Sequence, residues 1–244
     1  MWYKTLIIGN GEIGSALKRV LDKRGKFKSS IIDIKDKNFK ERVRNTNCRT
    51  LHICIPYSKS FIKDCLKYIK SFTPDLCIIH STVSVGTTKK VQLKTLSKVY
   101  VTHSPVRGQH PNMSESLELF VKYVGTDNKK AYQLAKKEMS NIKTEWVKDS
   151  KTTELGKMLS TSYYGICISW HREMKRICNH FNVDPKDAVS SFNKTYNTGY
   201  TKLRPNVVRP VLSFPTGKIG GHCVAQNAKL LGKQLKSKFL ELIK

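Results

Sequence analysis

Short apolar runs separated by amphipathic stretches make up the first 150 residues of the chain. The runs have the length of buried strands, and the stretches between them have the length and spacing of helices. Strands are predicted at Lys4–Ile8, Ser30–Ile34, Leu51–Ile55, Leu76–His80, Val99–Thr102, Phe120–Val124 and Thr144–Val147. Helices are predicted at Ile13–Lys23, Ser58–Ser71, Val85–Leu96 and Asn128–Asn141. This alternation predicts an α/β fold that begins with a Rossmann doubly wound parallel sheet.

The pattern changes near residue 150, where apolar residues begin to recur at helical spacing. Residues 152–181 carry this spacing throughout and predict one long helix. A second helix is predicted at Pro185–Phe192, because Asp184 can cap it and proline suits its first turn. Residues 193–221 are predicted to form a long polar loop before a last helix that begins near Val224. The predicted domains are a Rossmann domain at residues 1–149 and a smaller all-helical domain at residues 150–244.

The chain is strongly basic: 45 lysines and arginines against 18 acidic residues give a formal net charge of +27. Such a charge suits a nucleic-acid binder, an enzyme with an anionic substrate, or a solvated basic surface. The basic residues are spread along the chain, and aromatic residues are not interleaved with them as a base-stacking platform would need. We favour the solvated surface and keep nucleic acid open as a less favoured partner.

No apolar run is long enough to span a membrane, and the N-terminal residues lack the pattern of a secretory signal. The seven cysteines show no CxxC or Cys/His ligand spacing, which favours free thiols in a reducing compartment over disulfides or a metal site. The sequence therefore predicts a cytoplasmic protein with no membrane partner and no metal.

A glycine motif follows the first predicted strand: Gly9-Asn10-Gly11-Glu12-Ile13-Gly14 has the form GxGxxG and leads directly into a helix. In this context the glycines allow a tight turn, close approach of a pyrophosphate to the backbone, and packing of the helix on the strand. Asp33 ends the second strand, about 20 residues further on, where a carboxylate binds the adenosine ribose. The sequence predicts NAD as the cofactor, although Lys35 beside Asp33 leaves NADP open.

Three later segments carry residue types suited to chemistry. Ser81 and Thr82 follow a strand, where their hydroxyls can contact a cofactor or a substrate oxygen. Lys157 lies near the start of the long helix, where a lysine taken alone is expected at the surface, although a buried ammonium there could stabilise a developing alkoxide or move its proton. Cys223 lies in a glycine loop just before the last helix, whose N-terminal dipole favours a thiolate.

In this order, three segments resemble those of the nucleotide-sugar dehydrogenases, the UDP-glucose, GDP-mannose and UDP-N-acetylmannosamine 6-dehydrogenases. Ser81–Thr88 matches the STVPVGTT loop of that family with one change, and Glu154–Lys157 matches its ExxK. Gly217–Val224 resembles the GxxGGHCxP signature that carries the catalytic cysteine. The resemblance implies NAD-dependent oxidation of a primary alcohol on a sugar-type substrate, through a thiohemiacetal and a thioester on Cys223.

The resemblance also implies further roles. Lys157 and Thr82 would contact the reacting oxygen, Gly220 and His222 would contact the substrate, and the long helix 152–181 would form a homodimer. It covers the cofactor and central domains only, because nothing in the sequence corresponds to the second Rossmann-like domain that completes the nucleotide site in the family.

Several positions depart from the family pattern. Thr161 replaces an asparagine four residues after the lysine, and Asn227 replaces an aspartate four residues after the cysteine. Both positions support catalysis in the family, and an amide cannot act as a base, which puts thioester hydrolysis in doubt. Val106 stands in place of a glutamate, while the next residue, Arg107, can bind a carboxylate or phosphate. Further substrate contacts are predicted for Arg204 and Arg209.

Three hypotheses stay open at this point. The first is a nucleotide-sugar-dehydrogenase-like enzyme that uses Cys223. The second is a single-step dehydrogenase of the 3-hydroxyacid type, which needs no thiol. The third is a non-catalytic Rossmann protein that binds NAD or associates with nucleic acid, and the high positive charge motivates it.

Overall fold

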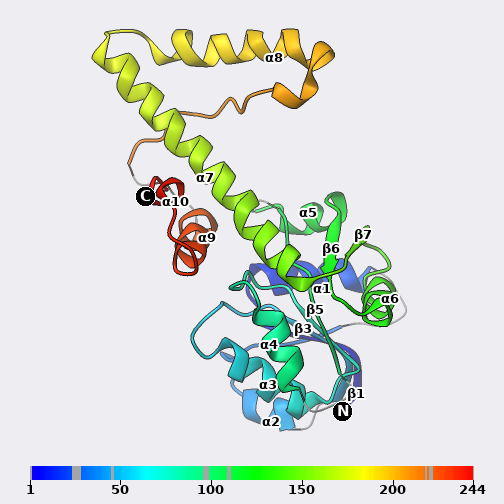
Figure 1. Ribbon diagram of the computed structural model, residues 1–244. Helices are drawn as coiled ribbons and strands as arrows, with labels where there is room; N and C mark the ends of the chain where they lie inside the picture. Colours follow the sequence, from blue (N-terminus) through cyan, green and yellow to red (C-terminus); the bar gives the residue numbers. More distant parts are fainter. Residues whose placement is uncertain are drawn as a thin grey trace. The chain divides into compact units, whose positions relative to one another are not determined.

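In the computed structural model, seven strands form one sheet in the order β2-β1-β3-β4-β5-β6-β7 (Figure 1). The structure describes residues 2–23, 29–44, 47–95, 99–108, 111–217, 219 and 222–243. The strands are β1 (Trp2–Ile8), β2 (Ser30–Ile32), β3 (Asn47–Ile53), β4 (Leu76–Ile79), β5 (Tyr100–His103), β6 (Lys122–Gly125) and β7 (Thr144–Val147). Strands β1 to β5 are parallel, whereas β6 pairs antiparallel with β5 and parallel with β7. The predicted α/β class and each predicted strand are confirmed, and the sheet is mostly rather than wholly parallel.

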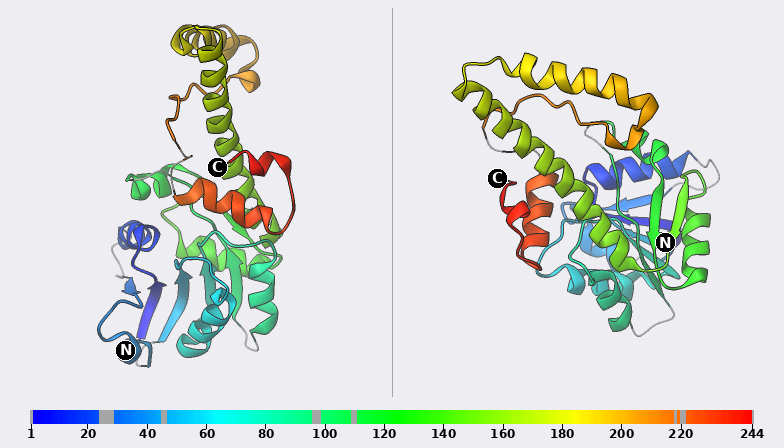
Figure 2. Two further views of the ribbon diagram at one scale, coloured as in Figure 1. Left: turned by 90° about the vertical axis from the view of Figure 1, so that its left-hand side faces the viewer. Right: turned by 45° about the horizontal axis from the view of Figure 1, so that its top comes forward.

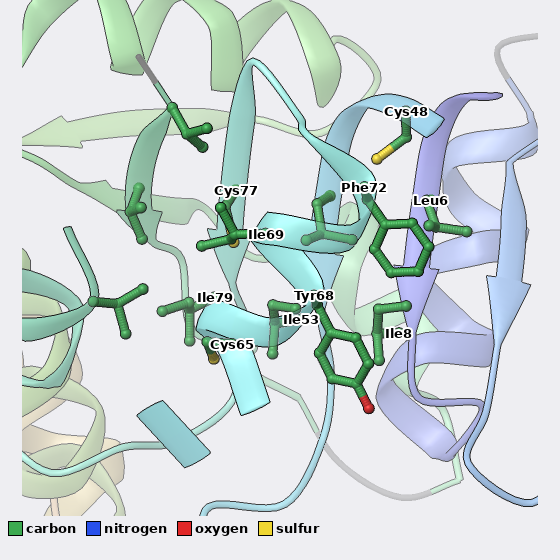
Figure 3. Packing of buried hydrophobic residues seen from close by; sticks show 14 of the residues in the cluster. Leu6, Ile8, Cys48, Ile53, Cys65, Tyr68, Ile69, Phe72, Cys77 and Ile79 are labelled. Atoms are coloured by element: carbon green, nitrogen blue, oxygen red, sulfur yellow. The ribbon is translucent and has the colours of Figure 1, made fainter. Parts of the chain in front are cut away.

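Helices cover both faces of the sheet. They are α1 (Glu12–Asp22), α2 (Phe39–Arg44), α3 (Phe61–Phe72), α4 (Thr87–Lys94), α5 (Met113–Leu119) and α6 (Lys129–Glu138). One core cluster joins α3 and α4 to the sheet, and Figure 3 shows Cys65, Tyr68, Ile69 and Phe72 of α3 directed at the strands. A second cluster joins α1, α5 and α6 to the opposite face. Leu6 and Ile8 of β1 belong to the first cluster and Ile7 belongs to the second, because successive side chains of a strand point to opposite faces of the sheet.

The strand order places a switch point between β1 and β3. The chain runs from β1 to β2 on one side and then returns to the other side of β1 with β3. In open α/β sheets of this order, ligands bind outside the carboxyl ends of the strands at that point. The glycine motif follows β1, so the topology brings it to this position.

By its internal contacts the chain divides into two compact units, Met1–Lys157 and Met158–Lys244. The long helix α7 (Ser150–His180) begins in the first unit, and the elements of the second unit follow it. These are a π-helical segment (Lys186–Ser191), α8 (Phe192–Leu203), a short 3-10 turn (Pro205–Val207), α9 (His222–Gly232) and α10 (Lys238–Glu241). Figure 2 shows α9 and α10 side by side, and Val224, Ala228 and Ile243 form a small buried cluster there. The predicted boundary between residues 149 and 150 stays a prediction about functional domains.

One sequence-based expectation is wrong. Residues 193–221 are not a loop throughout, because α8 runs from Phe192 to Leu203 and a 3-10 turn follows. None of the α8 side chains is buried, so the segment lacks the apolar periodicity from which a helix would be inferred. After α8 the chain returns alongside it: Asn197 exchanges two hydrogen bonds with the backbone of Arg209, each of 2.8 Å (Figure 1). The sequence also gave no sign of the short helices α2 and α5.

Candidate functional site

The glycine motif forms a tight cradle at the switch point. Gly9 has a positive φ of 102°, and a Cβ there would lie 2.5 Å from the carbonyl oxygen of Cys54, which follows β3. A Cβ on Gly14 would lie 1.8 Å from the carbonyl oxygen of Gly9, so α1 can contact the loop only through glycine. Gly11 differs, because no atom lies within 4 Å of its Cβ position. The cradle is therefore closed on its protein side and open at Gly11, where a ligand can approach the backbone.

The first turn of α1 completes this cradle. Gly11 is the N-cap residue, and no side chain caps the helix. The amide groups at the start of a helix attract the oxygens of a phosphate. Glu12 and Ile13, the other two motif residues predicted to contact the cofactor, lie in this first turn and are both half-buried.

Asp33 lies directly beside the cradle. Its Oδ2 accepts a hydrogen bond of 2.7 Å from the amide of Asn10, and its Oδ1 accepts one of 3.0 Å from the amide of Lys35. These two backbone hydrogen bonds, the Asn10 bond first, hold the pKa of Asp33 below its ordinary value. The carboxylate is thus ionised, oriented and partly exposed, as binding of ribose hydroxyls would require. Lys35 is exposed and contributes its backbone here.

The Ser81–Thr88 loop is fixed by a buried carboxylate that sequence reasoning left without a role. Glu154 of α7 has no exposed surface. Its side chain accepts hydrogen bonds from the amide of Gly86 at 2.5 Å, the amide of Thr88 at 2.8 Å and the hydroxyl of Thr88 at 2.7 Å. It caps the N-terminus of α4 in this way, although burial raises its pKa. The glutamate of the ExxK pattern therefore connects the Ser81–Thr88 loop to α7, the helix that also carries Lys157.

The hydroxyls predicted to reach a ligand differ in their surroundings. Ser81 is buried and donates a hydrogen bond of 2.6 Å to the carbonyl oxygen of Ile55, so its hydroxyl ties the loop to the segment after β3. Thr82 is half-buried. Lys157, the last residue of the first unit, is also half-buried. The contacts of these residues with a substrate or cofactor stay predictions.

A chain of buried polar groups runs beneath the Ser104–Pro105 turn. His80 donates from Nδ1 to the carbonyl oxygen of Ser104 at 2.9 Å, and its Nε2 lies 2.8 Å from Nδ1 of His52. Burial keeps the pKa of His80 well below its ordinary value, so the ring is neutral and its one proton is on Nδ1. His52 must then donate to His80. Glu138 lies at the far end of the chain, with Oε1 3.5 Å from Nε2 of His52.

Two basic residues lie near this turn: Arg107 follows it in the chain, and Lys122 contacts it. The guanidinium of Arg107 is exposed and lies over the rings of Phe120 and Tyr123, 5.3 and 5.8 Å from their centroids. Lys122 is buried, and its ammonium donates to the carbonyl oxygens of Ser104 at 2.7 Å and Pro105 at 3.2 Å. Sequence reasoning missed Lys122, although a lysine within the apolar run Phe120–Val124 was a usable signal.

In the second unit, two of the residues that depart from the family pattern lie in contact. Asn227 of α9 is buried and donates a hydrogen bond of 3.1 Å from Nδ2 to the hydroxyl of Thr161 on α7. The helices approach closely because Gly165 faces Val224, whose side chain would lie 2.7 Å from a Cβ at that position. Cys223 is an exposed free thiol in the first turn of α9. The structure therefore places a neutral hydrogen-bonded pair one helical turn from the cysteine.

The remaining predicted substrate residues belong to the second unit, and one of them is outside the described residues. Arg209 stacks on Tyr196, with its guanidinium carbon 3.6 Å from the ring centroid, and Arg204 is exposed at the end of α8. Gly220 lies outside the described residues. His222 begins α9, and its substrate role stays a prediction.

Three further features limit the kinds of site that the described residues can form. A cavity of about 290 Å³ is lined by Thr88, Gln92 and neighbouring charged groups, but by none of the predicted site residues. Among its charged groups, Lys89 pairs with Asp127 at 2.8 Å, and Asp149 accepts a hydrogen bond of 2.9 Å from the amide of Lys151. Over the described ranges there is no cluster of three potential metal ligands. Within the same part of the chain, no helix is long and apolar enough to cross a membrane.

The strand order, the glycine cradle and Asp33 define an α/β protein of the Rossmann type. No family model matches the sequence. It is similar to UDP-N-acetyl-D-mannosamine dehydrogenases, among them that of Methanococcus maripaludis, with 28% identity over 208 residues, 79% of this chain and 46% of that protein. This similarity to nucleotide-sugar dehydrogenases confirms the resemblance found in the motifs. It spans about half the length of the curated relatives it matches.

Solved structures share the fold. UDP-D-ManNAc dehydrogenase from Pyrococcus horikoshii has a TM-score of 0.78 at 17% identity, covering 100% of this chain and 68% of that one. The 3-hydroxyisobutyrate dehydrogenase of Mycobacterium tuberculosis has a TM-score of 0.72 at 12% identity, covering 99% and 91%. At these identities the likeness concerns the fold, which both dehydrogenase types share.

Proposed function

We propose that the chain is an NAD-dependent oxidoreductase that oxidises a primary alcohol of a small, anionic sugar-type substrate. The glycine cradle, closed by Gly14, open at Gly11 and flanked by the Asp33 carboxylate, is the observation that carries this proposal. Its carboxylate favours NAD over NADP, because a 2′-phosphate would meet a negative charge. Residues 1–149 hold the cofactor in this proposal, and residues 150–244 supply the catalytic and dimerisation elements.

Gly9, Gly11, Glu12, Ile13, Gly14, Asp33, Ser81 and Thr82 are the proposed cofactor contacts. NAD, when bound by these residues, would supply the hydride acceptor for each oxidation. Lys157 takes the alcohol proton, and Thr82 orients the oxygen that bears it. The thiolate of Cys223 adds to the aldehyde to give a thiohemiacetal, and loss of a second hydride leaves a thioester. Water then releases the acid and restores the thiol, so one substrate reduces two NAD.

The last step is where this chain departs from its relatives. The residue four positions after Cys223 is Asn227, which donates to Thr161 and has no carboxylate with which to activate water. We therefore expect hydrolysis of the thioester to be the slowest step. A single oxidation that ends at the carbonyl is the second candidate function, and the fold shared with 3-hydroxyisobutyrate dehydrogenase favours keeping it.

The test follows NADH formation with purified protein, NAD and a panel of nucleotide sugars, sugar phosphates and hydroxy acids. Two NADH per substrate, lost in Cys223→Ser, is the expected result, with turnover reduced at least about 100-fold. Cys167→Ser removes another free thiol of the second unit and serves as the matched control. One NADH per substrate that does not depend on Cys223 would select the single oxidation. NAD binding without any turnover, or steep salt-dependent binding to DNA, would replace the enzyme with a non-catalytic Rossmann protein.

We also propose a homodimer through the long helix. Leu159, Tyr163 and Trp170 on α7 and Phe181 directly after it are 51, 64, 55 and 69% exposed, and they recur at intervals that keep them near one face. Large apolar side chains in such a row are costly in water. We also propose that the protein works in the cytoplasm, because this compartment is reducing and the proposed reaction requires a free thiol.

Sedimentation equilibrium tests the dimer. The wild-type chain is expected to be dimeric at micromolar concentration, and Trp170→Glu should weaken association at least about 100-fold by placing a charge in the apolar row. Lys202→Glu changes an exposed charge on α8 and is the control. A monomeric wild-type protein, or a Trp170→Glu variant that stays dimeric, would contradict the proposal.

A further inference from the structure

We infer that His52 is a buried imidazolium, and that its second proton completes a chain of polar contacts that helps to hold α6 on the sheet. The chain runs from Glu138 on α6 through His52 on β3 and His80 after β4 to the carbonyl oxygen of Ser104. None of the proposed cofactor or catalytic residues belongs to this chain. The inference therefore does not depend on the proposed function.

The groups of this chain are withdrawn from water. His52 and Ser104 have no exposed surface, His80 is 1% exposed and Glu138 is 5% exposed. Water cannot replace a missing partner in such a place, and an unmatched buried polar group is costly. Each contact of the chain therefore needs a proton on one side and a lone pair on the other.

The count of protons starts at the Ser104 end. A carbonyl oxygen can only accept, so His80 donates to it from Nδ1 over 2.9 Å. Burial keeps the pKa of His80 well below its ordinary value, so this ring has one proton and a lone pair on Nε2. His52 donates from its own Nδ1 to that lone pair over 2.8 Å.

The Glu138 end of the chain requires one more proton. Oε1 of Glu138 accepts from the hydroxyl of Thr5 at 2.7 Å and Oε2 accepts from that of Thr50 at 3.2 Å, as an ionised carboxylate does. Nε2 of His52 lies 3.5 Å from Oε1, which is long for a hydrogen bond but suits an ion pair. A neutral ring would present a lone pair to this carboxylate. A proton on Nε2 removes the conflict between two acceptors.

With one proton fewer, no arrangement satisfies the whole chain. If a neutral His52 keeps its proton on Nδ1, its lone pair faces Glu138. If the proton moves to Nε2, the rings of His52 and His80 present lone pairs to each other, unless His80 gives up its bond to Ser104. The contact with Glu138 is the longest of the three, so it should open first. Loss of the proton should therefore loosen α6 at its C-terminal end.

The other titratable groups around this chain change their charge in different pH ranges. They are the thiols of Cys48 and Cys54, the ring of His103 and the ammonium of Lys122. Burial raises the pKa of both thiols to about 12 and lowers that of His103 to about 3, so all three are neutral near pH 7. Burial lowers the pKa of Lys122 to about 7, so its titration must be separated from that of the chain.

Glu138→Gln separates the two, because it removes the need for the second proton and leaves Lys122 in place. One glutamine N–H can donate to Nε2 of a neutral His52, while the other N–H and the oxygen bond the two threonine hydroxyls. We therefore expect this variant to fold with α6 in place. Glu145→Gln makes the same change at an exposed position of β7 and is the matched control.

The first measurement is the ring-nitrogen NMR spectrum of His52 in the isotope-labelled full chain at pH 5.5. A nitrogen that carries a proton differs widely in chemical shift from one that carries a lone pair. We expect two protonated nitrogens in the wild type and in Glu145→Gln, and one, Nδ1, in Glu138→Gln. One protonated nitrogen in the wild type would overturn the inference, and so would two in Glu138→Gln.

The second measurement is hydrogen exchange of the α6 amides at pH 5.5 and 8.5, corrected for intrinsic rates and compared with α3. The proton is bound when α6 is in place, so raising the pH favours the loosened helix. Protection of α6 should fall at least about tenfold in the wild type and stay constant in Glu138→Gln. An equal fall in both proteins would assign the effect to Lys122 and overturn the role of the proton.

A second variant keeps the inference testable if Glu138→Gln does not fold. The wild-type spectrum then decides whether Nε2 carries the proton. Lys122→Met removes the ammonium, and the fall in α6 protection with rising pH should persist in it; its disappearance would contradict the role of the proton. None of these readouts needs NAD or turnover, so their failure would leave the proposed function standing.

Discussion

Gly14→Ala is expected to abolish NAD binding and to destabilise the first unit. The added methyl group would lie 1.8 Å from the carbonyl oxygen of Gly9 and 3.4 Å from the side chain of Ile7. The first of these neighbours is backbone within the cradle, so either α1 or the loop must move. Overpacking of this kind costs about 1 to 3 kcal/mol, and the displaced helix start no longer faces the phosphates. Chemical denaturation and calorimetric titration with NAD measure the two effects.

Variants at two other glycines distinguish a loss of NAD binding from a loss of stability. Gly11 has a φ of −76° and open space at its Cβ position, so Gly11→Ala should fold normally yet weaken NAD binding at least about tenfold by occupying the approach to the backbone. Gly156 lies in a helix, also with open space, and Gly156→Ala should raise the free energy of unfolding by about 0.5 to 1 kcal/mol. A Gly14→Ala variant as stable as Gly156→Ala, with wild-type affinity for NAD, would contradict the assignment of the cradle.

Much of the first unit could be predicted from the sequence because its signals are local. The strands at Leu51–Ile55 and Leu76–His80 are apolar runs bounded by polar residues, and the structure has strands at both places. Within six residues, the GxGxxG motif predicts a tight turn, the start of a helix and the close packing of that helix on the preceding strand. The order of the strands follows from right-handed crossovers and the position of the glycine loop, so the switch point could be anticipated as well.

The residues that organise the candidate site were harder to find because their partners are distant in sequence. Glu154 bonds to Gly86 and Thr88, 68 and 66 residues away, and Lys122 bonds to Ser104, 18 residues away. The residues around each of them do not identify these partners, although the apolar run Phe120–Val124 marks Lys122 as a lysine in a buried strand. Helix α8 was not predicted for another reason. It buries no side chain, so its sequence has no apolar pattern, and tertiary context supports it instead. The antiparallel direction of β6 is likewise a property that a strand pattern does not encode.

Glu154→Gln is expected to lower the free energy of unfolding by about 2 to 3 kcal/mol, because a buried amide or hydroxyl donor loses its acceptor. The wild-type carboxylate accepts three hydrogen bonds with its two oxygens. Glutamine keeps one oxygen and places its own N–H groups against the second set of donors. The capped end of α4 and the loop before it should then fray. Denaturation measures the stability, and hydrogen exchange at the amides of Gly86 and Thr88 locates the loss.

The same variant tests whether the carboxylate positions the loop for function or only stabilises the fold. Glu173→Gln removes an exposed carboxylate of α7 that pairs with Arg176, and it should leave stability and hydrogen exchange unchanged. If Glu154 positions Ser81 and Thr82, then Glu154→Gln should reduce kcat more than it raises KM for NAD, and Glu154→Asp should restore part of kcat because it restores both acceptor oxygens. If Glu154→Gln loses stability but keeps the wild-type kcat, then Glu154 only caps α4. If Glu154→Asp recovers part of kcat, then the Glu154 carboxylate positions the Ser81–Thr88 loop for catalysis relative to Lys157 on the same helix.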